Sequence, residues 1–201
     1  MARRSDHTKE ELHELIVSET MAMVESFGAP NITAREIAKR IGYTPGTLYT
    51  HFDNLAAILL FVKARILAQL REDVLAAIKE ARDPQGRLLQ MGYAYVAFAE
   101  VHPHWFALLF NDSPEADVAV PQDLSQTVDS LFDLVTRELA ILNPRATEDE
   151  LELGVRALWC GVHGICALSL GNRLVTQDWR ADQQILKTLI SHFLDSWAIA
   201  H

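Results

Sequence analysis

Residues 42–52 read GYTPGTLYTHF and combine hydroxyl groups, one imidazole and several small side chains. The small residues come first and the hydrogen-bonding residues follow: Thr44, Pro45, Gly46 and Thr47, then Tyr49, Thr50 and His51. Hydroxyl and imidazole groups donate and accept hydrogen bonds, which suits contact with phosphate oxygens or base edges. Small residues matter because bulk would hold such an element out of a DNA groove. The stretch therefore has the residue types of a DNA-contacting surface.

Two short helices would position this surface. Thr33 and Glu36 have capping-box spacing, and the helix AREIAKRI that follows turns Ile37, Ala38 and Ile41 inward. Gly42 ends that helix, and Thr44 is expected to cap the next one, with Pro45 at its first position. The arrangement is a helix-turn-helix pattern, whose second helix enters the major groove by its N-terminal end.

The tight turn alone is weak evidence, since any helical protein can contain one. The basic outer face of the first helix, with Arg35, Lys39 and Arg40, adds to it. Gly42, Leu48 and Phe52 are expected to be structural, as turn and core residues. The predicted contact residues are Thr33, Arg35, Thr44, Pro45, Gly46, Thr47, Tyr49, Thr50 and His51.

The charge of the 201-residue chain is unevenly distributed. A formal charge of −9 argues against a nucleic-acid partner, since phosphate binding needs a positive surface. However, residues 1–52 carry six Lys and Arg against seven acids, and the rest of the chain carries 12 against 20. The acidity therefore belongs mainly to the later part of the chain.

Several classes of protein are not expected. Cys160 and Cys166 have neither a disulfide-framework nor a metal-site spacing, which favours a reducing cytoplasm and no metal or cofactor. The start, MARRSDHTKEE, lacks the apolar stretch of a secretory signal. Charged residues interrupt the apolar windows at 55–70 and 151–170, so no membrane association is expected.

Helix signals recur along the chain, while strand signals are nearly absent. Besides 34–41 and the helix beginning at 45, helices are expected at 8–27, from 53 or 54 to 78, and at 84–101, 103–111, 121–142, 148–171 and 179–199. The prediction is an all-α fold of nine helices. The composition changes near residue 53, which suggests a helix-turn-helix domain over 1–53 and a larger helical bundle over 54–201.

The segment TAREIAKRIGYTPGTLYTHF resembles the DNA-binding segment of the TetR family of transcriptional regulators, and the match extends over about residues 8–60. The resemblance implies a homodimeric repressor that binds a palindromic operator in double-stranded DNA. It also implies a C-terminal pocket whose small-molecule effector releases the DNA. Family members often carry a phosphate-contacting lysine where this chain has Leu55. Arg3 and Arg4 could compensate from an N-terminal arm, or belong to a merely solubilising tail.

Residues 91–110, MGYAYVAFAEVHPHWFALLF, contain six of the chain's 16 aromatic residues. Such a segment suits either an apolar ligand site with a few polar groups or an ordinary core. Tyr93, His102 and Trp105 are the candidates for ligand contact.

The stretch LWCGVHGICAL places Trp159 and His163 on one helix face and is similar to a Trp-x-x-x-His-Gly signature in one TetR branch. Both residues are ligand candidates, although His163 could instead be a satisfied core histidine. Gly161 and Gly164 would let a neighbouring helix approach closely. This helix and the last one look apolar almost all round, which suggests a homodimer interface built from both.

Two other classes of function stay open at this point. An enzyme could use His102, His104 and His163 as metal ligands, or Cys160 with His163 as nucleophile and base, although no HExxH motif supports this. A helical sensor module could instead act through a protein partner.

Overall fold

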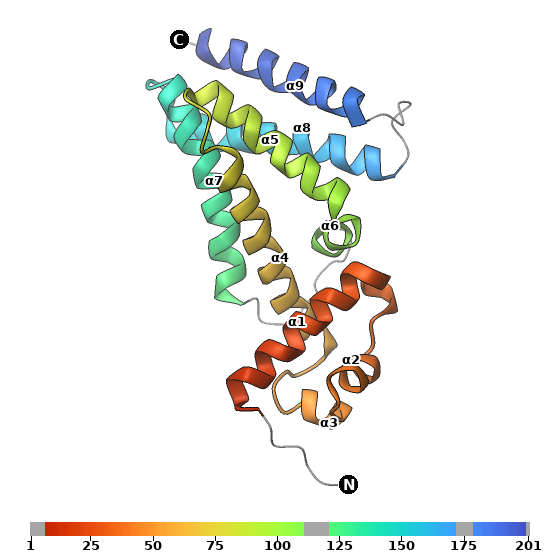
Figure 1. Ribbon diagram of the computed structural model, residues 1–201. Coiled ribbons are helices and arrows are strands. Elements are labelled where there is room, and N and C mark those ends of the chain that lie inside the picture. The colour runs from red at the N-terminus through yellow and green to blue at the C-terminus, as the bar shows by residue number, and fades with distance from the viewer. Residues whose placement is uncertain (1–6, 111–120, 172–178, 200–201) are drawn as a thin grey trace. The chain divides into compact units, whose positions relative to one another are not determined.

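The computed structural model describes residues 7–110, 121–171 and 179–199. Within these ranges the chain forms nine α-helices, one short 3₁₀ helix and no strand (Figure 1). The elements are α1 (Lys9–Phe27), η1 (Ala29–Asn31), α2 (Ala34–Ile41), α3 (Pro45–Leu48), α4 (Leu55–Ala77), α5 (Pro84–Val101), α6 (Pro103–Phe110), α7 (Gln122–Leu142), α8 (Glu148–Leu170) and α9 (Trp179–Ile199). The predicted all-α fold is confirmed, and only η1 was not expected.

Local capping explains why several helices begin where they do. Thr8 and Glu11 at the start of α1, and Thr147 and Glu150 at the start of α8, form complete capping boxes. At α2 only half of the box forms: the Thr33 hydroxyl accepts the Glu36 N–H, while the Glu36 carboxylate accepts from the Thr33 hydroxyl. An N-cap of this kind contributes about 0.5–2 kcal/mol.

The helices form two compact units. Unit 1 comprises residues 1–68 and 102–126, and unit 2 comprises residues 69–101 and 127–201. Helix α4 contributes to both units, and α6 belongs to unit 1 although it follows α5 in sequence. The boundary expected after residue 53 lies inside unit 1, between α3 and α4, and stays a prediction about the division of function.

Unit 1 is built around α1, which packs against α2 and α6, while α2 packs against α3. Its fully buried side chains include Ile16 of α1, Ile37 of α2 and Leu48 of α3. The side chain of Arg40 donates to Glu19 over 2.6 Å and so links α2 to α1. The core of unit 1 therefore fixes the helix-turn-helix from its inner side.

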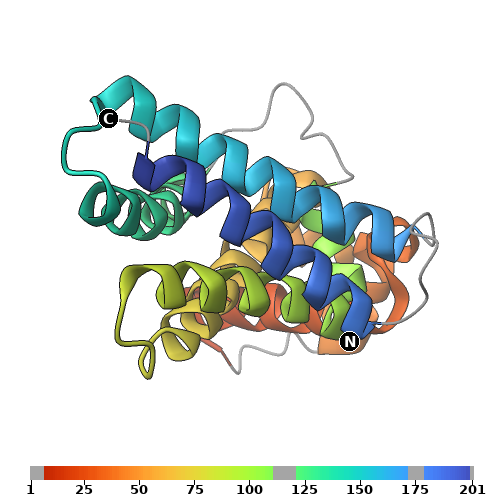
Figure 2. The same ribbon diagram turned by 90° about the horizontal axis from the view of Figure 1, so that it is seen from above.

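Unit 2 contains α5, α8 and α9, which pack against one another in pairs, and α8 and α9 lie side by side in Figure 2. A Cβ added to Gly161 would lie 2.7 Å from a methyl of Leu189, so this glycine permits close packing of α9, as predicted. Gly164 differs, because no atom lies within 4 Å of an added Cβ there. The Arg87 guanidinium donates to Glu138 over 2.7 Å and ties α5 to α7.

Helix α8, which was expected to be apolar almost all round, is apolar on two opposite sides and also carries exposed Glu152 and Arg156. Val155, Leu158 and Val162 are buried on one side, while Leu153 and Leu168 are exposed on the other. In length and composition α8 could cross a membrane, the single such helix in the part of the chain that the structure describes. Core helices of soluble proteins meet the same criteria, and α8 packs against α5 and α9.

The expectation that α9 is apolar almost all round is wrong. Leu186, Ile190 and Leu194 recur every four residues and are buried on one face. The exposed positions of α9 are mostly polar and include Gln183, Gln184, Lys187, Thr188, Ser191, His192, Asp195 and Ser196. Ile185 is the exception, a large apolar residue that is exposed.

Candidate DNA-binding surface

The turn between α2 and α3 depends on the backbone of Gly42. This residue has φ 78° and ψ 25°, in the left-handed region that glycine enters without steric cost. The next N–H, from Tyr43, donates to the carbonyl of Ala38 over 2.8 Å, the bond that closes a Schellman-type helix end. Gly42 is thus a turn residue, as expected, and fixes the direction in which α3 leaves.

Helix α3 is a single turn, and backbone hydrogen bonds extend its helical path as far as Phe52. The prediction that the Thr44 side chain caps α3 is wrong. Thr44 occupies the N-cap position with extended backbone angles, but its hydroxyl lies 3.0 Å from the hydroxyl of Thr47 and caps no backbone N–H. Because one of the two hydroxyls donates to the other, the pair retains one O–H for an external acceptor.

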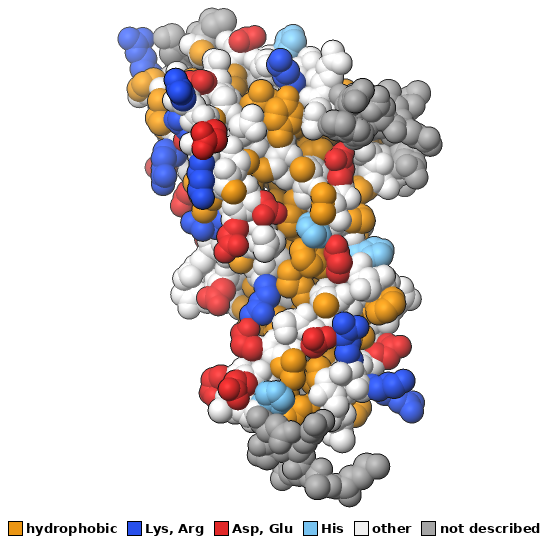
Figure 3. Space-filling model, in the orientation of Figure 1, with side chains coloured by type: hydrophobic (Ala, Val, Ile, Leu, Met, Phe, Trp, Pro, Cys, Tyr) orange, Lys and Arg blue, Asp and Glu red, His pale blue; other side chains and the backbone are white. Residues whose placement is uncertain are grey.

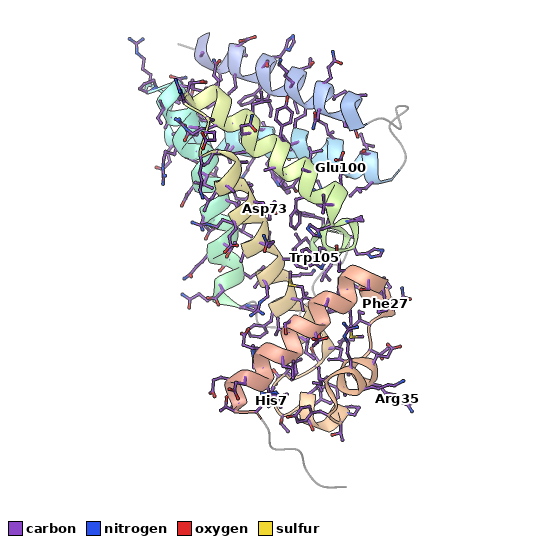
Figure 4. The ribbon with its side chains drawn as sticks, in the orientation of Figure 1. His7, Phe27, Arg35, Asp73, Glu100 and Trp105 are labelled. Atoms are coloured by element: carbon purple, nitrogen blue, oxygen red, sulfur yellow. The ribbon has the colours of Figure 1, made fainter. Side chains whose placement is uncertain are left out.

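The structure separates core residues from outward-facing residues in this segment. Leu48 and Phe52 are buried, as predicted. The exposed candidates are Thr33, Arg35, Thr44, Pro45, Gly46, Tyr49 and Thr50, whereas Thr47 and His51 are half-buried. Figure 4 shows the Arg35 side chain pointing away from α2. The Thr50 hydroxyl donates to the Thr47 carbonyl over 2.7 Å, which leaves the Thr50 oxygen as an acceptor. All nine candidates belong to α2, α3 and their flanking residues, on unit 1.

His51 has an asymmetric environment. Its Nδ1 atom is buried without a hydrogen-bond partner. An orphaned buried N–H is rarer than an orphaned acceptor, so the favoured tautomer has a bare Nδ1 and a hydrogen on Nε2. This tautomer makes Nε2 a donor, which is the group that a phosphate oxygen needs.

An aromatic cluster lies behind this segment. The ring of His13 stacks on Phe52 at 4.6 Å and meets Phe61 edge-on at 4.8 Å. Burial lowers the pKa of His13, the charge of Glu14 raises it, and the charge of Arg65 lowers it further. A neutral His13 can therefore pack as an aromatic side chain of α1 and support Phe52.

The charges around the helix-turn-helix are mixed, as Figure 3 shows for one face of unit 1. Arg40, which was placed on the basic outer face, is engaged with Glu19. Arg35 and Lys39 are exposed and provide the remaining positive charge of α2. Arg3 and Arg4 lie outside the described residues.

Sequence reasoning missed one polar contact of the turn. The Nδ1 atom of His7 lies 2.9 Å from the hydroxyl of Tyr43. This contact brings His7, which precedes the N-cap residue of α1, to the turn between α2 and α3. The two residues are 36 positions apart, and no local pattern in the sequence signals the pairing.

Two ligand candidates, His102 and Trp105, lie in unit 1 and bind α1. His102 contacts the carboxylate of Glu25 at 2.8 Å and stacks on Trp105 with ring centres 4.2 Å apart. The Trp105 indole N–H donates to the carbonyl of Met21 over 3.1 Å. These polar atoms hold α6 on α1.

Two other candidates, Trp159 and His163, come together in unit 2. Their rings stack with centres 5.2 Å apart, and His163 Nδ1 lies 3.0 Å from the hydroxyl of Tyr95 on α5. Burial lowers the pKa of His163 and raises the pKa of Tyr95, so both groups are neutral near neutral pH. Tyr95 was not among the candidates, and Tyr93, which was, is half-buried on the same helix.

The metal-ligand set of the enzyme alternative does not form one cluster within a compact unit. His102 and His104 belong to unit 1 and both contact Glu25, whereas His163 belongs to unit 2. In the described ranges no group of three or more His, Cys, Asp or Glu residues could hold a metal ion. Cys160 is exposed on α8.

Comparison with known proteins agrees with this surface. The family described as "Bacterial regulatory proteins, tetR family" matches residues 16–61. The domain described as "Tetracyclin repressor-like, C-terminal domain" matches residues 88–193, more than half of the chain. Both described families comprise transcriptional regulators and not enzymes.

Similar sequences include two regulators. The uncharacterized HTH-type transcriptional regulator YobS of Bacillus subtilis is 24% identical over 178 residues, which cover 88% of this chain and 85% of that protein. The HTH-type transcriptional activator FasR of Mycolicibacterium smegmatis is 28% identical over 115 residues, which cover 55% of this chain and 52% of FasR.

Similar solved structures share the fold. A protein of unknown function from Rhodococcus sp. RHA1 superposes with a TM-score of 0.77 at 18% identity, covering 98% of this chain and all of that one. BioQ, solved with its double-stranded DNA operator, superposes with a TM-score of 0.64 at 17% identity, covering 94% of this chain and 98% of that one. With its exposed helix-turn-helix surface and both family matches, the chain belongs to the TetR family of DNA-binding transcriptional regulators.

Proposed function

We propose that the chain is a cytoplasmic, homodimeric repressor that binds a palindromic operator and releases it when a small effector binds. The observation that carries this proposal is the division of residues 44–52 into exposed and buried side chains. Hydroxylic and small side chains face outward, while Leu48 and Phe52 are buried beneath them. In a dimer, two such surfaces would enter successive major grooves about 34–36 Å apart.

The chemistry of each side chain suggests its role on DNA. Thr44, Thr47 and Tyr49 are placed to meet base edges or nearby phosphates, because their hydroxyls donate and accept. Arg35 and the Nε2 donor of His51 suit phosphate oxygens, which accept hydrogen bonds. Leu55 begins α4 and offers no such donor, so the phosphate contact that family members make there is expected to be missing.

The exposed apolar side of α8 supports a dimer. Leu153, Ala157, Cys160, Gly164 and Leu168 recur at intervals of three or four residues and form what we call the α8 stripe. Leu153 is 71% exposed, and Gly164 faces open space. A second copy of α8 packed against the stripe would remove this apolar surface from water. On α9, exposed Ile185 is the large apolar side chain available to a second copy.

Unit 2 supports an effector site at Trp159, His163 and Tyr95. The three side chains gather aromatic surface around neutral hydrogen-bonding groups, the usual composition of a small-molecule site. Tyr93 remains a candidate on the same helix. We do not place effector contacts at His102 and Trp105, because these residues hold α6 on α1.

DNA binding can be tested by fluorescence polarisation on DNA from the region upstream of the gene. Thr47→Ala and Tyr49→Phe should each weaken specific binding, while the dimer and its helix content stay unchanged. Ser125→Ala is the matched control, because it removes an exposed hydroxyl on α7. Binding that is independent of sequence, or absent at low salt, would contradict the proposal. If the variants bind DNA normally, a module acting on a protein partner is favoured instead.

Reporter expression decides the direction of regulation. Because FasR is an activator by name, activation is the second candidate. Deletion of the gene should raise expression of the neighbouring target if the chain represses it. A fall in expression would identify an activator.

Sedimentation velocity tests the dimer. Leu153→Glu should convert dimer to monomer, because the substitution puts a charge into the α8 stripe. Ile141→Glu is the matched control, since Ile141 is 53% exposed on α7 and lies outside the stripe. In addition, Cys160 should react with a maleimide faster in the monomeric variant than in the wild type. Equal sedimentation of the two Glu variants would refute an interface at the stripe.

A further inference from the structure

One side of α8 carries a line of aromatic and polar residues that could contact a ligand. Trp159, His163, Cys166 and Ser169 follow one another at intervals of four, three and three, so they share a side of the helix. Trp159 and His163 belong to the proposed effector site. The line continues past them to Cys166, which is only 2% exposed, and on to Ser169.

The line ends at a buried carboxylate. Asp182, in the first turn of α9, is only 2% exposed. One of its oxygens, Oδ2, accepts a hydrogen bond from the hydroxyl of Ser169. The other oxygen, Oδ1, is buried and has no hydrogen-bond partner. A buried carboxylate oxygen without a hydrogen-bond partner is costly, so this group needs an explanation.

A second carboxylate faces the same place. Glu100 is exposed near the C-terminal end of α5, where Figure 4 labels it. Partial burial of its carboxyl group raises the pKa of Glu100, and the nearby carboxylate of Asp182 raises it further. The thiol of Cys166 responds to the same pair, since burial, then Glu100 and Asp182, raise its pKa to about 12. Helices α5, α8 and α9 pack against one another in pairs, and across these contacts the carboxylates of Glu100 and Asp182 influence each other and Cys166.

Neither carboxylate has an ion pair within the described ranges. Asp182 accepts the Ser169 hydrogen bond, and the carboxylates of Asp182 and Glu100 repel each other. A pair of neighbouring carboxylates, one of them with an unpartnered oxygen, favours a bound cation at this helix junction. A metal ion is disfavoured, because no group of three ligating residues forms in the part of the chain described. An ammonium group needs fewer ligands and donates up to three hydrogen bonds.

We propose that Asp182 and Glu100 anchor a protonated amine at the junction of α5, α8 and α9. Exposed Glu100 receives the amine from solvent, and buried Asp182 binds it through Oδ1. The line of residues on α8 connects this anchor to the aromatic residues, because Ser169, Cys166, His163 and Trp159 share one side of the helix. The ligand is therefore a monoamine whose apolar part extends toward Tyr95 and Trp159. The inference rests on the proposed effector function and specifies its ligand as a cation.

Calorimetry with the 201-residue chain and 2-phenylethylamine tests the anchor, with 2-phenylethanol as the neutral analogue of nearly the same shape. The amine should bind, and the alcohol should bind at least tenfold more weakly. Glu100→Gln and Asp182→Asn should each weaken amine binding at least tenfold and leave alcohol binding unchanged. Asp195→Asn, an exposed carboxylate on α9, is the matched control. Equal binding of amine and alcohol overturns the proposal, as does the absence of binding by every monoamine from methylamine to 2-phenylethylamine.

Two further measurements keep the test decisive. Glu100→Lys places an ammonium group beside Asp182, so it should raise the melting temperature and abolish the amine response. Stabilisation by calcium or magnesium chloride in place of the amine would identify a metal site and overturn the proposal.

Binding of operator DNA in the absence of amine is measured in parallel by fluorescence polarisation. Loss of DNA binding with amine binding intact would refute the regulator function alone, and the reverse would refute the amine site alone.

Discussion

The Nδ1 atom of His102 lies 2.8 Å from a carboxylate oxygen of Glu25, and this contact ties α6 to α1. The neighbouring His104 adds a second tie, since its Nδ1 lies 2.7 Å from the backbone carbonyl of Glu25. Helix α6 follows directly after α5, whose residues belong to unit 2, whereas α1 supports the helix-turn-helix. His102 and His104, which the sequence suggested as possible metal ligands, therefore hold α6 against α1 within unit 1.

Glu25→Ala should therefore loosen α6. The substitution leaves His102 without its carboxylate partner, which costs about 1–3 kcal/mol of the free energy of unfolding. Hydrogen exchange at residues 103–110 should become faster, and the urea midpoint should fall. Ser26→Ala is the control, because its exposed hydroxyl bonds only to Ala22 of its own helix. Unchanged exchange in α6 would show that the Glu25 contact does not hold this helix.

The helices were predictable because their signals are local. Capping pairs, glycine and proline positions and apolar spacing lie within a few residues of each boundary, as at Thr147 and Glu150. Pairings between distant residues were not predictable. His7 with Tyr43 and Tyr95 with His163 join positions 36 and 68 apart, and only the packing of helices brings them together. Prediction also failed at short range for Thr44. Its hydroxyl was expected to cap a backbone N–H of α3, but it hydrogen-bonds with the hydroxyl of Thr47 instead.

Arg35 and Thr47 should affect DNA binding differently. If Arg35 contacts a phosphate, Arg35→Ala weakens all operator variants equally and reduces the slope of log K against log salt by about 0.9. If Thr47 contacts a base edge, Thr47→Ala instead changes the relative affinities for operators altered at one base pair. Lys79→Ala is the charge control, because Lys79 is exposed and lies in unit 2. A normal salt slope for Arg35→Ala would remove this residue from the contact set.

Gly154 and Gly164 should respond oppositely to alanine. A Cβ on Gly154 would lie 2.7 Å from the Trp197 ring, which is held by a hydrogen bond from its N–H to the Leu139 carbonyl. Gly154→Ala therefore overpacks the core and should cost about 1–3 kcal/mol of the free energy of unfolding. In the monomeric Leu153→Glu background, a Cβ on Gly164 meets no neighbouring element among the described residues, so Gly164→Ala should gain about 0.5–1 kcal/mol because alanine favours a helix. Urea unfolding of both variants measures the difference, and two effects of the same sign would contradict the packing described.

The pH dependence of stability should contain a contribution from His13. Burial holds its pKa in the folded chain below the ordinary value of 6.5. Just below pH 6.5 the unfolded chain therefore binds more protons than the folded chain, so the free energy of unfolding falls as pH decreases. The contribution is complete above pH 6.5 and is lost as pH falls through the lowered pKa.

His13→Phe retains an aromatic ring against Phe52 and Phe61 and should reduce this pH dependence. Phe61→Leu should reduce it partly, because it opens the environment of the imidazole. Urea midpoints measured from pH 7.5 to pH 5 would reveal the effect as the difference between wild type and variant, and parallel curves would show that His13 does not contribute.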